Sequence, residues 1–178
     1  MTPLENLQVR ELTSADVAAY KALRDEVLAF HEEAFTSDAA SEALRTAQSY
    51  EKRLGAAGDA DEGEGFTIGA WRGDQLVGAI TCERDARSKV RHIGHVVGMM
   101  VHIDMQSQGV GRALLEALIA RATFDGSLML LTLSVTADNH PALRLYEGAG
   151  FIRYGSLPRA MRVAGRFLDK DLMVLNLR

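Results

Sequence analysis

The chain has 178 residues, of which 47% are hydrophobic and 25% are charged, so we expect one globular domain over residues 1–178 with a sizeable core. The formal net charge is −4 and Lys and Arg are not concentrated in any run, which argues against a nucleic-acid partner. The single cysteine, Cys82, excludes a disulfide framework and a thiolate zinc site, and the lack of a long apolar run or leader pattern predicts a cytoplasmic protein with no membrane partner.

The N-terminal part of the chain predicts a strand followed by a helix. Residues 7–12 (LQVREL) alternate apolar and polar side chains, which is the period of a half-buried strand. Ser14 is the expected cap of a helix that extends to about residue 30. The apolar residues of this helix recur at three- and four-residue spacing and predict one packed face, formed by Val17, Tyr20, Leu23, Val27 and Phe30.

A second, more polar helix is expected over residues 36–54, starting near Ser37 or Asp38. The next segment, residues 55–65, is small, acidic and poor in bulky apolar residues, so it predicts a surface loop. A lid or an acidic guide for an amine is the alternative for this loop.

The middle of the chain predicts a hairpin, a strand and a helix. Two strand-like runs flank Gly73-Asp74, which is a hairpin signal. Residues 92–103 are rich in β-branched and apolar side chains, as a central strand would be. A polar turn then leads into an amphipathic helix that should end near Phe124.

The C-terminal part predicts a buried strand, a short helix and further strand. Residues 128–135 form a nearly continuous apolar run, which is typical of a strand covered on both faces. The short helix should begin at Asn139, with Pro141 in its first turn, and end at Gly148 or Gly150. With a last strand near the C-terminus, the order of elements predicts a mixed α/β (α+β) fold with helices on a central sheet.

The turn before the middle helix reads Gln106-x-x-Gly109-x-Gly111-Arg112. It lacks the Gly-Lys-Ser/Thr of a P-loop and the third glycine of a dinucleotide fingerprint. Glycines allow close approach to backbone amides, and the first amides of a helix have no internal partners. The turn is therefore a candidate pyrophosphate cradle with Arg112 beside it, and the alternative is a helix start whose glycines serve the turn only.

Two motifs together resemble the GNAT N-acetyltransferase superfamily. The segment VHIDMQSQGVGRALLEALI, residues 101–119, is similar to the family's strand, Gln/Arg-x-x-Gly-x-Gly/Ala turn and helix. Asn139, Tyr146 and Gly150-Phe151 match its second signature in order and spacing, and both ends of the chain look like small bacterial-type members. The resemblance implies a single domain whose mostly antiparallel, twisted mixed sheet has six or seven strands, is flanked by about four helices, and splays between the fourth and fifth strands.

The resemblance also implies acetyl-coenzyme A as cofactor and a set of residues that bind it. The backbone of Met99, Met100 and Val101 would line the acetyl group and pantetheine arm. Asn139 would bind that arm, and Tyr146 would lie beside the sulfur. The pyrophosphate would be held by the turn, namely Gln106, Ser107, Gln108, Gly109, Val110, Gly111 and Arg112.

The implied function is transfer of an acetyl group from acetyl-CoA to a primary amine of a small molecule or peptide, by direct attack, with Tyr146 as general acid to the thiolate. Glu83 and His95 are candidate general bases, with a surface or core-edge role as the alternative for each. Ser134 stands where some relatives that act on protein N-termini have glutamate, which disfavours that substrate. An acyl-CoA-binding or sensing protein without catalysis, and a transferase of another short acyl group, are the alternatives.

No metal is expected. His92, His95 and His102 lie on one predicted strand, but strand alternation places His95 on the face opposite the other two. The resemblance implies a possible homodimer, because homodimers are common in the family, and the final strands could pair across such an interface.

Overall fold

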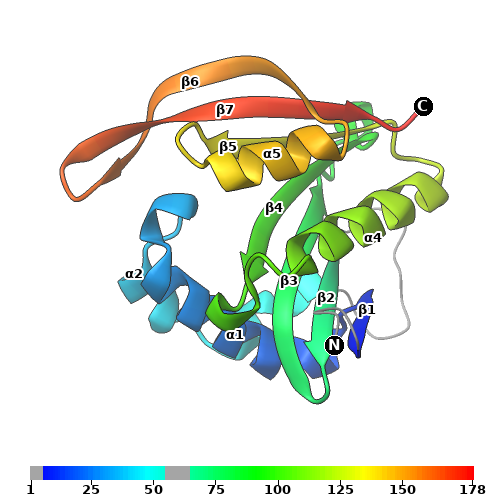
Figure 1. Ribbon diagram of the computed structural model, residues 1–178. Helices are drawn as coiled ribbons and strands as arrows, with labels where there is room; N and C mark the ends of the chain where they lie inside the picture. Colours follow the sequence, from blue (N-terminus) through cyan, green and yellow to red (C-terminus); the bar gives the residue numbers. More distant parts are fainter. Residues whose placement is uncertain (1–5, 55–64) are drawn as a thin grey trace.

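The computed structural model describes residues 6–54 and 65–178, which form a seven-stranded sheet with helices on both faces (Figure 1). The strand order is β1-β2-β3-β4-β5-β7-β6, and every neighbouring pair is antiparallel except β4 and β5. The strands are β1 (Leu7–Glu11), β2 (Phe66–Arg72), β3 (Gln75–Arg84), β4 (Ile93–Val101), β5 (Leu130–Thr136), β6 (Ile152–Val163) and β7 (Arg166–Asn176). The expected mixed, mostly antiparallel sheet is confirmed.

The helices separate onto the two faces of the sheet. The α-helices are α1 (Val17–Phe30), α2 (Ala39–Ala43), α3 (Glu51–Leu54), α4 (Val110–Asp125) and α5 (His140–Gly148). One core cluster joins α4 and α5 to the sheet through residues such as Leu114, Leu118 and Tyr146. The other joins α1 and α3 to the opposite face through residues such as Tyr20, Leu23 and Leu54. We call these the α4/α5 face and the α1/α3 face.

The parallel contact between β4 and β5 is short. Its three residue pairs are Ile93 with Leu130, Gly94 with Leu131, and His95 with Thr132. Beyond His95, β4 has no β5 partner in the described structure, whereas β5 continues against β7 as far as Thr136. The splay expected between the fourth and fifth strands is therefore present, and residues 96–101 of β4 form an open edge.

A bulge interrupts β4 within this open edge. Ala79 of β3 pairs with Met100, but Thr81 pairs with Val97, so β4 has one residue more than β3 between these pairs. Gly98 lies in the bulge with φ +60°, a left-handed conformation that favours glycine. After the bulge, Met99 packs with the cluster on the α4/α5 face, and Met100 is buried on the α1/α3 face.

Most predicted elements are confirmed, and three predictions in the N-terminal third are wrong. The cap of the first helical segment is Thr13 rather than Ser14, because the Asp16 carboxylate accepts a hydrogen bond from the Thr13 amide at 2.9 Å. Phe30 is 65% exposed because it is the last residue of α1, so it does not belong to the packed face.

The second polar helix is also not continuous. It breaks into α2, a 3-10 turn over Ala47–Tyr50, and α3. Asp38 does start it as expected, since its carboxylate accepts hydrogen bonds from the amides of Ala40 and Ser41. The acidic loop and its suggested lid role fall on residues 55–64, outside the described residues.

Cys82 lies at the centre of the α4/α5-face cluster. Its side chain is fully buried in β3, and a Cβ at Gly94 of the neighbouring strand would lie only 2.7 Å from its sulfur. Burial raises the pKa of the Cys82 thiol to about 12, and the nearby Arg84 charge only partly opposes this effect. The thiol is therefore a packing group in the core.

Candidate active site

The glycine turn before α4 is built to present backbone amides. Ser107 has φ +59° and Gly109 has φ +87°, so the chain twice enters the left-handed region within three residues. Gly109 is the N-cap of α4, and its carbonyl oxygen accepts the hydrogen bond from the Ala113 amide at 3.0 Å. The amides that precede Ala113 in the first turn of α4 have no intrahelical partner, and the helix dipole makes this end favourable for an anion.

The polar side chains of the turn have different roles. Gln106 Nε2 donates to the Val101 carbonyl oxygen at 3.3 Å and lies 2.7 Å from Nε2 of His31. Gln108 Nε2 donates to the Asp104 carbonyl oxygen at 2.5 Å. Both glutamines therefore brace the turn, while the Arg112 side chain on α4 is exposed and free to contact a ligand.

Gly111 lets α4 approach the other elements of the site. A Cβ at this position would lie 3.1 Å from Cε of Met99 on β4 and 3.5 Å from Cδ2 of Leu145 on α5. The start of α4 thus lies against both the open edge of β4 and the helix α5. This proximity brings the two sequence motifs into one place.

Tyr146 is buried on α5 beside the open edge. Its side chain is 7% exposed, its hydroxyl donates to Sδ of Met99 at 3.3 Å, and its ring packs edge-on against Phe151. Burial raises the pKa of Tyr146 to about 12. The phenol therefore keeps its proton at neutral pH and faces β4 as a hydrogen-bond donor.

Asn139 holds the start of α5. Its Oδ1 accepts a hydrogen bond from the Ala142 amide at 3.2 Å, and Pro141 occupies the first turn of the helix. At the other end, Gly150 with φ +97° follows the helix. Asn139 caps the start of α5, and Tyr146 lies about two turns farther along the same helix.

The two candidate bases lie on the α1/α3 face, adjacent to each other. Glu83 of β3 and His95 of β4 are paired in register. The Glu83 carboxylate accepts a hydrogen bond from Arg53 Nη2 at 2.7 Å, and His95 Nδ1 lies 2.8 Å from the Thr132 hydroxyl across the short parallel contact. Neither group lies on the face that carries Tyr146.

A polar cluster on the α1/α3 face had no counterpart in the sequence predictions. Arg24 of α1 donates through Nε to the Glu42 carboxylate at 2.6 Å, and Tyr50 also donates to Glu42. Burial raises the pKa of Glu42, but the hydrogen bonds from Tyr50 and Arg24, together with the Arg24 charge, outweigh burial and lower it to about 2. Arg24 follows Tyr20 by four residues on the packed face of α1, and a charged residue at such a position was the available signal.

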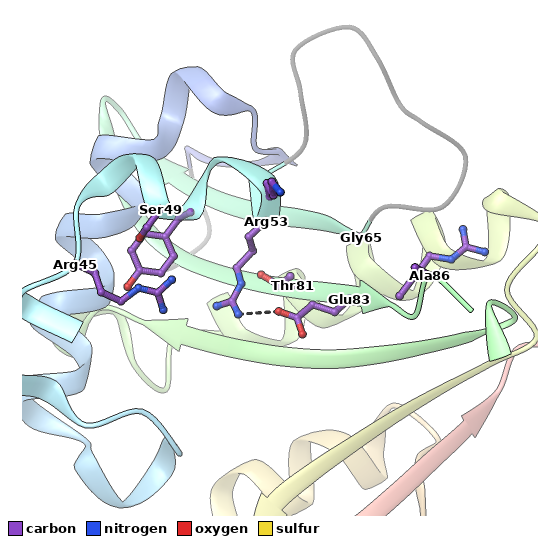
Figure 2. Close-up of a pocket in the computed structure, with 10 residues that line it drawn as sticks. Arg45, Ser49, Arg53, Gly65, Thr81, Glu83 and Ala86 are labelled. Atoms are coloured by element: carbon purple, nitrogen blue, oxygen red, sulfur yellow. Dashed lines mark hydrogen bonds and ion pairs between the residues drawn. The ribbon is translucent and has the colours of Figure 1, made fainter. Parts of the chain in front are cut away.

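A pocket of about 400 Å³ opens beside this cluster. Figure 2 shows Arg53 extending from α3 to Glu83 on β3, with Arg45 on the same side of the pocket. Thr81 and Tyr50 also line it. The pocket is therefore polar and lies on the face opposite Tyr146.

The described residues show neither a metal-binding cluster nor a membrane-spanning helix. Residues 6–54 and 65–178 contain no group of three or more His, Cys, Asp or Glu side chains placed to hold a metal ion. No helix within these ranges is long and apolar enough to cross a membrane.

Comparisons with curated proteins give partial matches. The chain is 32% identical over 81 residues to N-alpha-acetyltransferase 30 of Xenopus laevis. The matched segment covers 46% of this chain and 29% of that protein. The chain is also 34% identical over 77 residues to an L-amino acid N-acyltransferase of Escherichia coli. This segment covers 43% of this chain and 44% of that protein. Each match thus spans less than half the length of the relative.

Solved structures and a family model cover more of the chain. A GNAT-family acetyltransferase from Streptococcus pneumoniae superposes with a TM-score of 0.85 at 27% identity, over 96% of this chain and 99% of that chain. A Salmonella typhimurium acetyltransferase structure described with its cofactor acetyl-CoA has the same fold, with a TM-score of 0.78 at 22% identity over 97% of this chain and 95% of that chain. Residues 21–151 match the model of the acetyltransferase (GNAT) family, so the chain belongs to the GNAT acetyltransferase family.

Proposed function

We propose that this protein transfers an acetyl group from acetyl-CoA to a primary amine of a small molecule or peptide. The observation that carries the proposal is the meeting of three features at one place: the amide-presenting turn of α4, the open edge of β4 and the Tyr146 hydroxyl. The relatives support an amine acceptor, since one is named for N-alpha acetylation and another for acylation of L-amino acids.

The residues of the turn fit a pyrophosphate. Ser107 and Gly109 are exposed and left-handed, so they direct successive amides outward, and Arg112 adds an exposed positive charge. The open edge of β4 has backbone groups without a β5 partner, which a pantetheine amide can satisfy. In this proposal the backbone of residues 99–101 binds the arm, and Asn139 contributes from the start of α5.

When bound, acetyl-CoA supplies an acetyl group as a thioester with a thiol leaving group. The acceptor nitrogen forms the new bond to the acyl carbon as the carbon–sulfur bond breaks. The nitrogen loses one proton and the sulfur gains one. A backbone amide of Met100 or Val101 on the open edge can polarise the acyl carbonyl oxygen, as in an oxyanion hole.

Tyr146 holds the proton that the leaving sulfur needs. Its pKa of about 12 lies above the ordinary value of a thiol, so the phenol acts first as a hydrogen-bond donor that stabilises the developing thiolate. The hydroxyl already lies 3.3 Å from a sulfur atom, that of Met99. On the other side of β4, Glu83 and His95 are the candidates to accept the acceptor's proton, directly or through water.

Replacing Gly109 by alanine should weaken coenzyme A binding by about 10-fold, measured by calorimetry. The residue has φ +87°, where a side chain costs about 1–2 kcal/mol. A change in this backbone redirects the amides at the start of α4. Stability falls as well, so binding is measured at a temperature where the variant is folded.

Gly73→Ala is the matched control for this substitution. Gly73 has φ +58° in the β2–β3 hairpin and has no atom within 4 Å of the position of a Cβ. It should lose similar stability and keep the affinity for coenzyme A. Equal affinity of the Gly109 variant and the unsubstituted protein would remove the turn from the binding site.

The pH profile of kcat should show no loss from Tyr146 up to about pH 10. Burial raises the pKa of the phenol to about 12, so the donor form is complete below its unfolded value near 10 and is lost only as the pH approaches 12. At lower pH the rate should rise with pH as the acceptor amine becomes neutral. A basic limb between pH 8 and 9 that disappears in Tyr146→Phe would contradict this placement of the proton.

A thiol-release assay with acetyl-CoA and a panel of primary amines tests the function itself. Release of coenzyme A that depends on the amine supports a transferase. Tight coenzyme A binding without amine-dependent release across the panel would favour the acyl-CoA-binding or sensing alternative. The same assay with propionyl-CoA and succinyl-CoA establishes the acyl preference.

A further inference from the structure

The bulge of β4 is surrounded by polar groups from three other parts of the chain. A Cβ built on Gly98 would lie 3.7 Å from the Tyr20 hydroxyl, 3.8 Å from Arg53 Nη1 and 4.0 Å from Arg24 Nη1. Apart from the chain neighbours of Gly98, no atom of the described residues lies closer to this position. The absence of a side chain at residue 98 therefore leaves a small space bounded by two guanidinium groups and one hydroxyl on the α1/α3 face.

Arg24 has a hydrogen-bond donor that is directed to this space and is otherwise unused. The residue is only 4% exposed. Its Nε donates to Glu42 and its Nη2 donates to the Ser37 hydroxyl at 3.1 Å, but Nη1 is buried and has no partner among the described residues. A buried charged donor without an acceptor is costly, so this atom favours any group bound here that supplies an acceptor oxygen.

Arg53 places a second donor beside the same space. Its Nη2 is engaged with Glu83, while its Nη1 makes only a long hydrogen bond of 3.4 Å to the Tyr20 hydroxyl. The two Nη1 atoms, together with the Tyr20 hydroxyl, thus converge on Gly98 from α3 and α1.

The charge of the cluster favours an anion. Among the described residues, Arg24, Arg45 and Arg53 form ion pairs with Glu42 and Glu83, so three positive charges face two negative ones. A ligand with one negative charge would neutralise the group. Its two oxygen atoms could accept from both Nη1 atoms, which suits a carboxylate.

The space also lies next to the proposed site of transfer. Gly98 immediately precedes Met99, whose side chain contacts Tyr146 on the other face, and both residues lie on the open edge of β4. A group bound at Gly98 therefore approaches the acyl carbon from the α1/α3 face. Arg53 borders this space through Nη1 and also lines the pocket with Glu83 (Figure 2), so it links the two.

We propose that Arg24, Arg53 and Tyr20 form a carboxylate-binding site at the Gly98 bulge. The proposal rests on the proposed acyl transfer and specifies its substrate class. The carboxylate can come from the acceptor, as the α-carboxylate of an amino acid whose nitrogen lies one carbon away. It can also come from the acyl donor, as the free carboxylate of a dicarboxylic acyl group such as succinyl. Either source uses the same donors.

Paired substrates distinguish the two sources. With acetyl-CoA, L-alanine, L-leucine and L-phenylalanine are each compared with their carboxamides, which keep the amine and lose the charge. With the carboxamides as acceptors, succinyl-CoA is compared with acetyl-CoA. We expect kcat/KM to be about 10-fold or more higher for the carboxylate member in one of the two comparisons, because charge-assisted hydrogen bonds are lost in the other member.

Two variants and a control test the residues. Arg53→Gln removes one donor, and Gly98→Ala fills the space with a methyl group. Each should lower the preference for the carboxylate member to about 3-fold or less, mainly through KM. Arg121→Gln, on α4 and the opposite face, should leave the preference unchanged. Because each result is a ratio within one protein, a general loss of stability or rate does not affect it.

Binding provides the same comparison without turnover. If the acceptor carries the carboxylate, calorimetry in the presence of coenzyme A should show that the unsubstituted protein binds N-acetyl-L-leucine more tightly than its carboxamide. If the acyl donor carries it, succinyl-CoA should bind more tightly than acetyl-CoA. Ratios near one in all comparisons, or a preference that Arg53→Gln and Gly98→Ala leave intact, would overturn the carboxylate site. Amine-dependent acetyl transfer could still stand in that case, whereas failure to bind coenzyme A would count against the proposed function.

Discussion

Replacing Tyr146 by phenylalanine is expected to lower kcat by about 10²-fold or more, the usual effect of removing a positioned proton donor. The ring of Tyr146 packs against Phe151, and phenylalanine keeps that packing. Only the hydroxyl, which now donates to Met99, is lost. The substitution therefore isolates the donor from the fold.

The split between kcat and KM makes this result specific. Because the hydroxyl acts on the leaving sulfur, KM for the acceptor amine should change little, while kcat and kcat/KM fall together. The measurement is steady-state thiol release with an amine that the unsubstituted protein accepts. Tyr154→Phe, at an exposed position on β6, is the matched control and should retain full activity.

Unchanged turnover in Tyr146→Phe would show that the phenol is only a packed ring. The thermal unfolding of the two proteins should be compared at the same time. A large loss of stability would indicate that the hydrogen bond to Met99 matters for the fold, and activity would then be measured well below the unfolding temperature.

Replacing Glu42 by alanine is expected to destabilise the protein by about 3–5 kcal/mol, because it leaves a buried arginine without its counter-charge. Arg24 is 4% exposed, and in the described structure its only other hydrogen-bond partner is Ser37. Tyr50 would lose its acceptor as well. Glu42→Gln keeps an acceptor oxygen and should recover part of the loss.

The effect of Glu42 should depend on pH with a defined sign. Its pKa in the folded protein is lowered to about 2 from an ordinary value of 4.5. The stabilisation is therefore complete above about pH 4.5 and is lost as the pH falls toward 2. Urea unfolding at pH 7 and at pH 3 should show a larger difference between the protein and Glu42→Ala at pH 7.

Glu33→Ala provides the matched control for Glu42→Ala. Glu33 is exposed and lies 4.0 Å from Arg166, so its removal should change the free energy of unfolding by no more than about 0.5 kcal/mol. Similar small losses for both variants would mean that the buried cluster contributes little to stability.

Sequence patterns predicted the local structure around the candidate site where neighbouring residues alone determine it, and the roles of the site residues stay predictions. Asn139 and Pro141 start α5 because an amide oxygen caps a helix and proline fits its first turn, and these rules involve neighbouring residues only. Gly109 is left-handed for a similarly local reason. Tyr146 was identified by its motif spacing, and its role as general acid stays a prediction.

The polar contacts on the α1/α3 face could not be predicted by such local rules, because the residues involved meet only in the tertiary structure. Arg24 and Glu42 lie on separate helices, and Arg53 reaches a residue thirty positions later on β3. The broken second helix has the same origin: Tyr50 and Leu54 are buried against the sheet and α1, and the chain bends to place them. Periodicity alone gives no sign of such a bend.

The burial of Cys82 has a practical consequence for measuring this protein's reaction. Aromatic disulfide reagents are attacked by thiolates, and a fully buried thiol with a pKa of about 12 supplies almost none at pH 8. As the chain has no other cysteine, colour from such a reagent reports liberated coenzyme A with little background from folded protein. A slow rise in colour without coenzyme A would instead report exposure of Cys82 on unfolding.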